Sequence, residues 1–162
     1  MAPIDSPLTL SLALLACWAV VGAAGLLRTH SVALVGRVLF PLGAIIGVGL
    51  AIVAALSLTE PVEHATLHIG LPDLPMHVRL DNLSRVFLAL LGSASAGVSL
   101  FAAGYFRKGE GTAPGVLGLQ YHLFLASMGF VLVADDAYAF MVAWETMALT
   151  SYFLVTAQHG IP

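Results

Sequence analysis

Long apolar runs are the feature that most restricts how this chain can fold. Five runs of about 20 residues are separated by short polar stretches. At 1.5 Å per residue, a helix of that length crosses the hydrocarbon core of a bilayer, which is about 30 Å thick. We therefore predict an all-α membrane protein, a bundle of about five transmembrane helices that forms a single transmembrane domain over residues 1–162. The helices are expected near residues 8–27, 32–58, 81–104, 116–134 and 137–157.

The scarcity of charge supports the same class and excludes others. Only 9% of the residues are charged, whereas a soluble domain needs about a quarter to face water. A formal net charge of -3, without a basic patch, speaks against binding to nucleic acid. The sequence also has no nucleotide-binding loop and no Ser/His/Asp arrangement, so we expect no catalytic site of its own.

The distribution of basic residues predicts the orientation in the membrane. Four of them lie in the first and third connections between runs: Arg28, Arg37, Arg107 and Lys108. The second and fourth connections are mainly acidic. By the positive-inside rule, the first and third connections are cytoplasmic, the N-terminus is outside and the C-terminus is cytoplasmic. This predicts a multi-pass protein of the cell inner (plasma) membrane.

The connection between the second and third runs, residues 59–79, has the alternating pattern of β-strands. Prolines at positions 72 and 75 indicate a turn between two short strands. We predict a β-hairpin on the outer membrane surface, and a register centred on the turn would place His68 opposite His77. A metal site there would need a further spaced ligand, which the sequence does not offer, so we expect no metal.

Two kinds of residue at the helices indicate local structure. Gly43 and Gly47, and likewise Ser93 and Gly97, have the spacing that lets membrane helices approach closely. At the start of the third run, Asp81 is expected to cap the helix, and Arg85 lies four residues later on the same face. We interpret these two residues as a helix cap and an ion pair.

The strongest functional candidate is Glu145, the only acidic residue well inside any of the five runs. It lies eight residues into the fifth run, about 12 Å from its start and close to the bilayer centre. An ionised carboxylate costs at least about 2.5 kcal/mol there, which makes a functional role the default hypothesis. Helical spacing places Tyr138, Tyr152 and Thr156 on the same side. His122, in the fourth run, is a further candidate for proton transfer.

These residues resemble a known family. The stretch 144–155, WETMALTSYFLV, resembles the fifth-helix signature of the antiporter-like membrane subunits of respiratory complex I, Mrp-type cation/proton antiporters and energy-converting hydrogenases. The segment Arg79–Ser84 resembles the opening of that family's third helix. Residues 121–155 are most similar to the large membrane subunit of hydrogenase-4 and formate hydrogenlyase. Such subunits have about fourteen helices, so the resemblance implies that this chain is the N-terminal part of a longer subunit, whether as a fragment, a truncated reading frame or one piece of a split subunit.

The resemblance implies a proton-translocating subunit of a redox-driven complex of the hydrogenase-4, formate hydrogenlyase or NADH:quinone oxidoreductase type. Such a subunit holds no cofactor, and its partners are other membrane subunits and a peripheral redox arm. Glu145 matches the family's fifth-helix Glu, which pairs with a Lys of a later helix. Two alternatives stay open: a subunit of an Mrp-type antiporter, and a structural membrane fragment in which Glu145 only packs.

Overall fold

The computed structural model describes residues 6–71, 73–105 and 112–157, without the side chain of residue 105. Its helices and strands follow the chain in the order α1 (Pro7–Ala24), η1 (Gly25–Arg28), α2 (Val32–Leu34), η2 (Val35–Leu39), α3 (Phe40–Leu56), β1 (Glu63–Leu71), β2 (Leu74–Leu80), α4 (Asn82–Tyr105), α5 (Pro114–Val133) and α6 (Ala137–Thr156). Arg107 and Lys108, on which part of the predicted orientation depends, lie outside the described residues.

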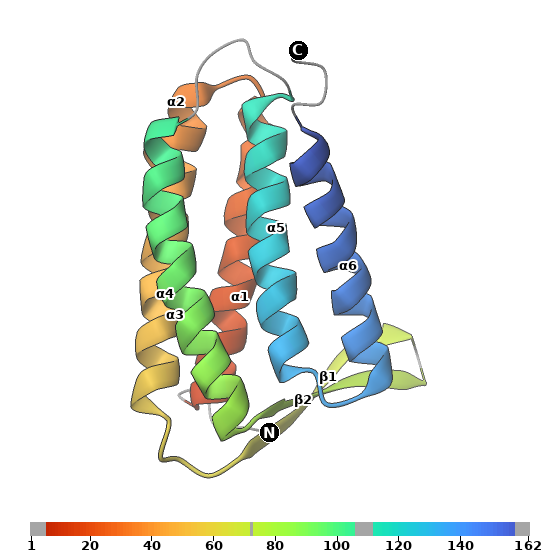
Figure 1. The fold of residues 1–162 in the computed structure, drawn as a ribbon. Coiled ribbons are helices and arrows are strands. Elements are labelled where there is room, and N and C mark those ends of the chain that lie inside the picture. Colours follow the sequence, from red (N-terminus) through yellow and green to blue (C-terminus); the bar gives the residue numbers. More distant parts are fainter. Residues whose placement is uncertain (1–5, 72, 106–111, 158–162) are drawn as a thin grey trace.

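Five helices in the described ranges are long and apolar enough to cross a membrane, which confirms the predicted all-α membrane protein. Figure 1 shows them side by side, with α5 between α1 and α6, and α3 beside α4. The predicted β-hairpin is present as the antiparallel pair β1 and β2. It lies at the end of the bundle where α1 begins and α5 turns into α6 (Figure 1).

Capping side chains and prolines mark where several of the helices begin. Ser6 caps α1, because its hydroxyl accepts the backbone N–H of Thr9 at 3.2 Å. Asp136 caps α6 in the same way, accepting the N–H of Ala139 at 2.7 Å. Proline stands in the first turn of α1 and of α5, where a missing N–H costs nothing.

The second span contains a widened turn. Residues Val35–Leu39 form a π-helix, in which the N–H of Phe40 donates to the carbonyl of Val35. Pro41 follows directly, and it has no N–H to donate, while its ring would clash with the carbonyl four residues before it. A π-turn is one way in which a helix accommodates such an interruption without breaking.

The helices α3 and α4 are in close contact through glycine. A Cβ atom added to Gly92 would lie 2.5 Å from the carbonyl oxygen of Gly47 and 2.7 Å from the backbone N of Ala51. The expected role of Gly47 in close packing therefore holds. The expected role of Gly97 is wrong for the described part of the chain, because no described atom lies within 4 Å of a Cβ added there. On α4, it is Gly92 and Ser95 that face α3, whereas Ser93 is exposed.

This difference between two glycines of one helix gives a testable prediction. Gly92→Ala forces the backbones of α3 and α4 apart and should lower the free energy of unfolding by about 1–3 kcal/mol. Gly97→Ala adds a methyl group where space is open, and better helix propensity should make it neutral or stabilising by up to about 1 kcal/mol. Unfolding titrations in mixed detergent micelles would measure both, and equal effects would contradict the close contact at Gly92.

The register of the hairpin differs from the predicted one. Next to the turn, Gly70 pairs with Pro75, but the register shifts between Leu67 and Gly70, and His77 then pairs with Thr66 rather than His68. Gly70 has a φ of 115°, which L side chains rarely adopt. The placement of His68 opposite His77 is therefore wrong, because an irregularity in β1 inserts extra residues on that strand.

Candidate functional site

Glu145 lies on the outward face of α6 and is exposed. The residues that α6 turns toward the bundle are small or polar, namely Ala139, Ala143 and Thr150, and they are buried. Beside Glu145, the ring of Trp144 stacks on that of Phe140 at a centroid distance of 5.6 Å. The described part of the chain thus presents the carboxyl group away from its own core.

The two tyrosines that were predicted to share a face with Glu145 have different surroundings. Tyr152 is 63% exposed and contacts the ring of Phe153 edge-on at 5.5 Å. Tyr138 is half-buried against the hairpin, where a Cβ atom on Gly70 would lie 2.9 Å from its ring. Tyr138 therefore packs on β1, and the expected polar stripe is divided between an outward surface and a hairpin contact.

His122 is fully buried among α1, α3 and α5. Its Nδ1 lies 2.7 Å from the carbonyl oxygen of Gly118. Its Nε2 points toward Gly43 and makes no short hydrogen bond with a described residue, although the backbone carbonyl of Leu39 also acts as an acceptor for the ring. A buried imidazole held only by backbone carbonyls is a candidate for binding water or exchanging a proton.

Further polar groups line the interior next to His122. The ring of Tyr121 meets that of His122 at 5.2 Å, and the Tyr121 hydroxyl lies 2.9 Å from Ser99 Oγ. The Tyr121 hydroxyl also donates to the carbonyl of Ser95 at 3.4 Å. Sequence reasoning missed this interior polar group, although the spacing of Ser95 and Ser99, four residues apart on one helix face, was a usable signal.

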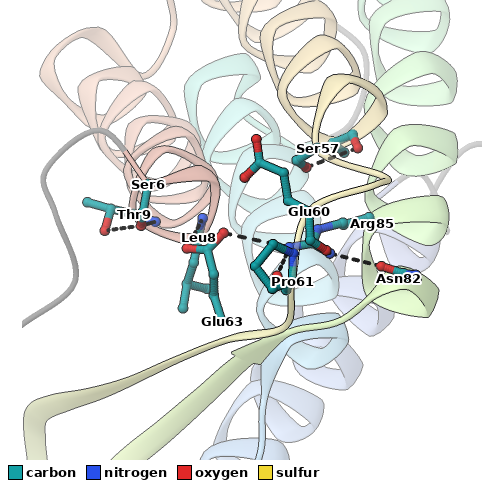
Figure 2. A network of polar contacts seen from close by, with 10 residues as sticks. Ser6, Leu8, Thr9, Ser57, Glu60, Pro61, Glu63, Asn82 and Arg85 are labelled. Atoms are coloured by element: carbon teal, nitrogen blue, oxygen red, sulfur yellow. Dashed lines mark hydrogen bonds and ion pairs between the residues drawn. The ribbon is translucent and has the colours of Figure 1, made fainter.

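Arg85 is the centre of a buried polar network (Figure 2). Its guanidinium donates to the carbonyls of Glu60 at 2.6 Å and Pro61 at 2.7 Å, and to Asn82 Oδ1 at 2.9 Å. It also forms an ion pair with Glu63 at 3.7 Å. The second oxygen of the Glu63 carboxylate accepts the backbone N–H of Leu8 at 3.3 Å. One arginine thereby ties α4 to the α3–β1 connection, and through Glu63 to the start of α1.

Asp81 has the geometry of the predicted helix cap, because Oδ1 accepts the N–H of Ser84 at 2.8 Å. That backbone hydrogen bond lowers the pKa of the Asp81 carboxyl below its ordinary value. Its ionic partner is Arg79 at 3.4 Å, and not Arg85 as the sequence suggested. Arg85 is drawn away because its guanidinium donates to the backbone carbonyls of Glu60 and Pro61.

The corner between α5 and α6 is bound to the hairpin by an ionic cluster. Asp135 pairs with Arg79 at 3.2 Å and with His64 at 3.4 Å. Asp136 pairs with the ring of His77 at 3.3 Å and also accepts its backbone N–H. Among the described residues, no group of three or more His, Cys, Asp or Glu side chains is arranged to hold a metal ion.

Backbone contacts reinforce this connection. Ala134 forms a bridge with Val78, and the N–H of Asp135 donates to the carbonyl of His77 at 2.9 Å. The hydrogen bonds from Ala139 and His77 lower the pKa of the Asp136 carboxyl. Asp135 and Asp136, which the sequence indicated only as a corner, thus attach the hairpin to the helix that carries Glu145.

The lowered pKa of Asp136 has a consequence for the attachment of the hairpin. The ionised Asp136 carboxylate stabilises the folded chain fully at a pH above the pKa of this carboxyl in the unfolded chain, about 3.9. This stabilisation is lost as the pH falls through the still lower pKa of the folded chain. We expect the protection of the His77 and Ala139 amides from hydrogen exchange, corrected for intrinsic rates, to fall below about pH 4. Asp136→Ala should reduce that protection roughly fivefold at neutral pH, because alanine has no side-chain acceptor for the two N–H groups.

Asp73→Ala is the matched control, because Asp73 lies exposed in the hairpin turn. In this variant the protection of the His77 and Ala139 amides should equal that of the natural chain at every pH. An Asp136→Ala chain that keeps full protection at neutral pH would contradict the capping role.

Comparisons with known proteins give partial matches. An uncharacterized protein of Mycobacterium tuberculosis is 36% identical over 120 residues, which are 72% of this chain and 17% of that protein. Hydrogenase-4 component B of Escherichia coli is 36% identical over 81 residues, 50% of this chain and 12% of the relative. NADH-quinone oxidoreductase subunit L of Mycobacterium tuberculosis is 31% identical over 78 residues, 48% of this chain and 12% of the relative. No family model matches the chain.

The five apolar helices define a multi-pass membrane protein. The partial homology to hydrogenase-4 component B and to NADH-quinone oxidoreductase subunit L supports, at a coarse level, the family of antiporter-like subunits. The chain spans less than a fifth of the length of each of these relatives.

Proposed function

We propose that this chain is part of a proton-translocating membrane subunit in a redox-driven complex of the hydrogenase-4, formate hydrogenlyase or NADH:quinone oxidoreductase type. The observation that carries the proposal is the placement of Glu145. It is the only acidic residue within the five spans, about 12 Å from the start of α6, and it faces out of the bundle. The partial matches to subunits of two such complexes agree with it.

An outward-facing carboxyl group at this depth needs a partner. In lipid, the ionised form would cost at least about 2.5 kcal/mol, so the exposed face of α6 calls for a neighbouring element with polar or cationic groups. The family resemblance implies a Lys on a later helix of the same subunit. In that arrangement Glu145 accepts and releases the proton, and Tyr152, exposed two turns along the same helix, lies on the path.

His122 has a separate place in the proposal. Its Nε2, which makes no short hydrogen bond with a described residue, lies inside the bundle formed by α1, α3 and α5, and no contact among the described residues joins it to Glu145. We assign it to an internal branch in which the Tyr121 and Ser99 hydroxyls are the neighbouring groups. The proposed orientation places the hairpin end of the bundle outside and the other end in the cytoplasm.

The test is proton movement in inverted membrane vesicles from a strain that lacks the gene and from the same strain with the gene restored. In a redox-driven complex, addition of the electron donor should acidify the restored vesicles and not the deleted ones. In an Mrp-type antiporter, added Na⁺ or K⁺ should move protons without an electron donor. In a structural fragment, neither treatment should distinguish the two strains, and that result would refute the proposal.

A further inference from the structure

A cleft of about 1240 Å³ opens between α1 and α6, and α5 forms its floor. Its body is apolar and is lined by residues such as Ala16, Phe130 and Val142. The end of the cleft at the hairpin is polar, because His64, His68 and Asp135 line it. The cleft is separate from Glu145, which does not line it.

The depth of the cleft matches one leaflet of a bilayer. On α1 its lining runs from Thr9 to Ala19, ten steps along the helix or about 15 Å, which is half of the roughly 30 Å hydrocarbon core. On α6 the lining ends at Thr146, the tenth residue of that helix. A transmembrane helix would need a groove through the full core, whereas the acyl chain of a lipid needs only this half.

The polar end has the chemistry of a head-group site. His68 and Thr66 are exposed on β1 at the mouth, and no described residue forms a hydrogen bond with either side chain. The imidazole N–H and the hydroxyl are donors for phosphate oxygens. Asp135, which also lines the mouth, forms an ion pair with Arg79 at 3.2 Å and contacts His64 Nδ1 at 3.4 Å, and the arginine limits the repulsion of an anion.

We propose that the cleft binds one glycerophospholipid from the leaflet at the hairpin end. Its phosphate lies beside His68 and Thr66, and one acyl chain runs along Ala16 toward the middle of the bilayer. The lipid fills the space between α1 and α6, two helices that both pack against α5 and contact the hairpin.

The experiment is native mass spectrometry of the chain, purified in mild detergent from its own membranes together with the subunits that accompany it. The natural chain should retain one phospholipid through detergent washing. Ala16→Phe fills the apolar cleft and should lose that lipid. Ala23→Phe is the matched control, an equally exposed alanine of α1 outside the cleft, and it should retain the lipid. His68→Leu should reduce retention, because it removes the phosphate donor.

A natural chain without a retained lipid, or an Ala16→Phe chain that keeps it, would overturn the proposal. A second measurement does not depend on a variant. Phospholipid added to the delipidated natural preparation should raise the thermal unfolding temperature and saturate at one lipid per chain, whereas the absence of a saturable rise would overturn the proposal. A benzophenone side chain at position 16 should crosslink to phospholipid in native membranes, and a polypeptide adduct there would show that a protein segment occupies the cleft.

Discussion

Replacing Glu145 by Gln is expected to abolish redox-driven proton translocation while leaving the complex assembled. Glutamine has the shape and hydrogen-bonding capacity of the protonated carboxyl group, but it cannot release a proton. The side chain is exposed and forms no hydrogen bond or ion pair with a described residue, so the substitution should not disturb the bundle. The loss should be about 100-fold or more, the size typical of removing a proton-transferring side chain.

The measurement is the initial rate of vesicle acidification after addition of the electron donor, normalised to the amount of chain in the membrane. Glu145→Asp keeps a carboxyl group on a shorter side chain and should retain part of the rate. Glu60→Gln is the matched control, because Glu60 is exposed in the connection before β1, outside the five spans, and should leave the rate unchanged. Full activity of the Glu145→Gln chain would remove Glu145 from the proton path and favour a packing role.

The second large effect is expected at Arg85. Arg85→Met keeps most of the side-chain volume but removes the donors to Glu60, Pro61 and Asn82. It also leaves Glu63 without its cationic partner, and one oxygen of Glu63 is already buried without a hydrogen bond among the described residues. Breaking a buried pair by removing one partner typically costs about 3–5 kcal/mol, and we expect a loss of stability of that size.

Thermal or mixed-micelle unfolding of the purified chain would measure this loss. Arg37→Met is the control, because Arg37 is exposed and its replacement should change stability by about 0.5 kcal/mol or less. Adding Glu63→Gln to Arg85→Met should recover part of the loss, since the uncompensated charge then disappears. Strictly additive effects of the two substitutions would show that Arg85 acts on the carbonyls alone.

The fold class was predictable because it follows from the length of the apolar runs. An apolar run long enough to cross a bilayer becomes a helix, since lipid offers no other partner for backbone polar groups. The hairpin was predictable as well, from alternation around a turn that contains prolines. Its register was not, because the shift depends on Gly70 at a φ of 115° and on the packing of Tyr138 from α6 against it. Both features depend on the tertiary structure and not on the local sequence.

The site was predictable only where a local rule decides it. Asp81 caps its helix because a cap needs only the next three residues. The partner of Arg85 was mistaken, because spacing on one helix favours Asp81, whereas carbonyls 24 and 25 residues away bind the guanidinium. The surroundings of His122 come from three helices, and one sequence does not reveal which small residues will face it.

The attachment of the hairpin to the α5–α6 corner also sets an order for biogenesis. His77 and Asp136 are 59 residues apart, so at about 5–20 residues per second the hairpin emerges roughly 3–12 seconds before the corner that holds it. During that interval the backbone of β2 lacks the contacts that Ala134 and Asp135 later make with Val78 and His77. The nascent hairpin is then most open to proteolysis or mispairing, and insertion of α5 and α6 ends this vulnerable period.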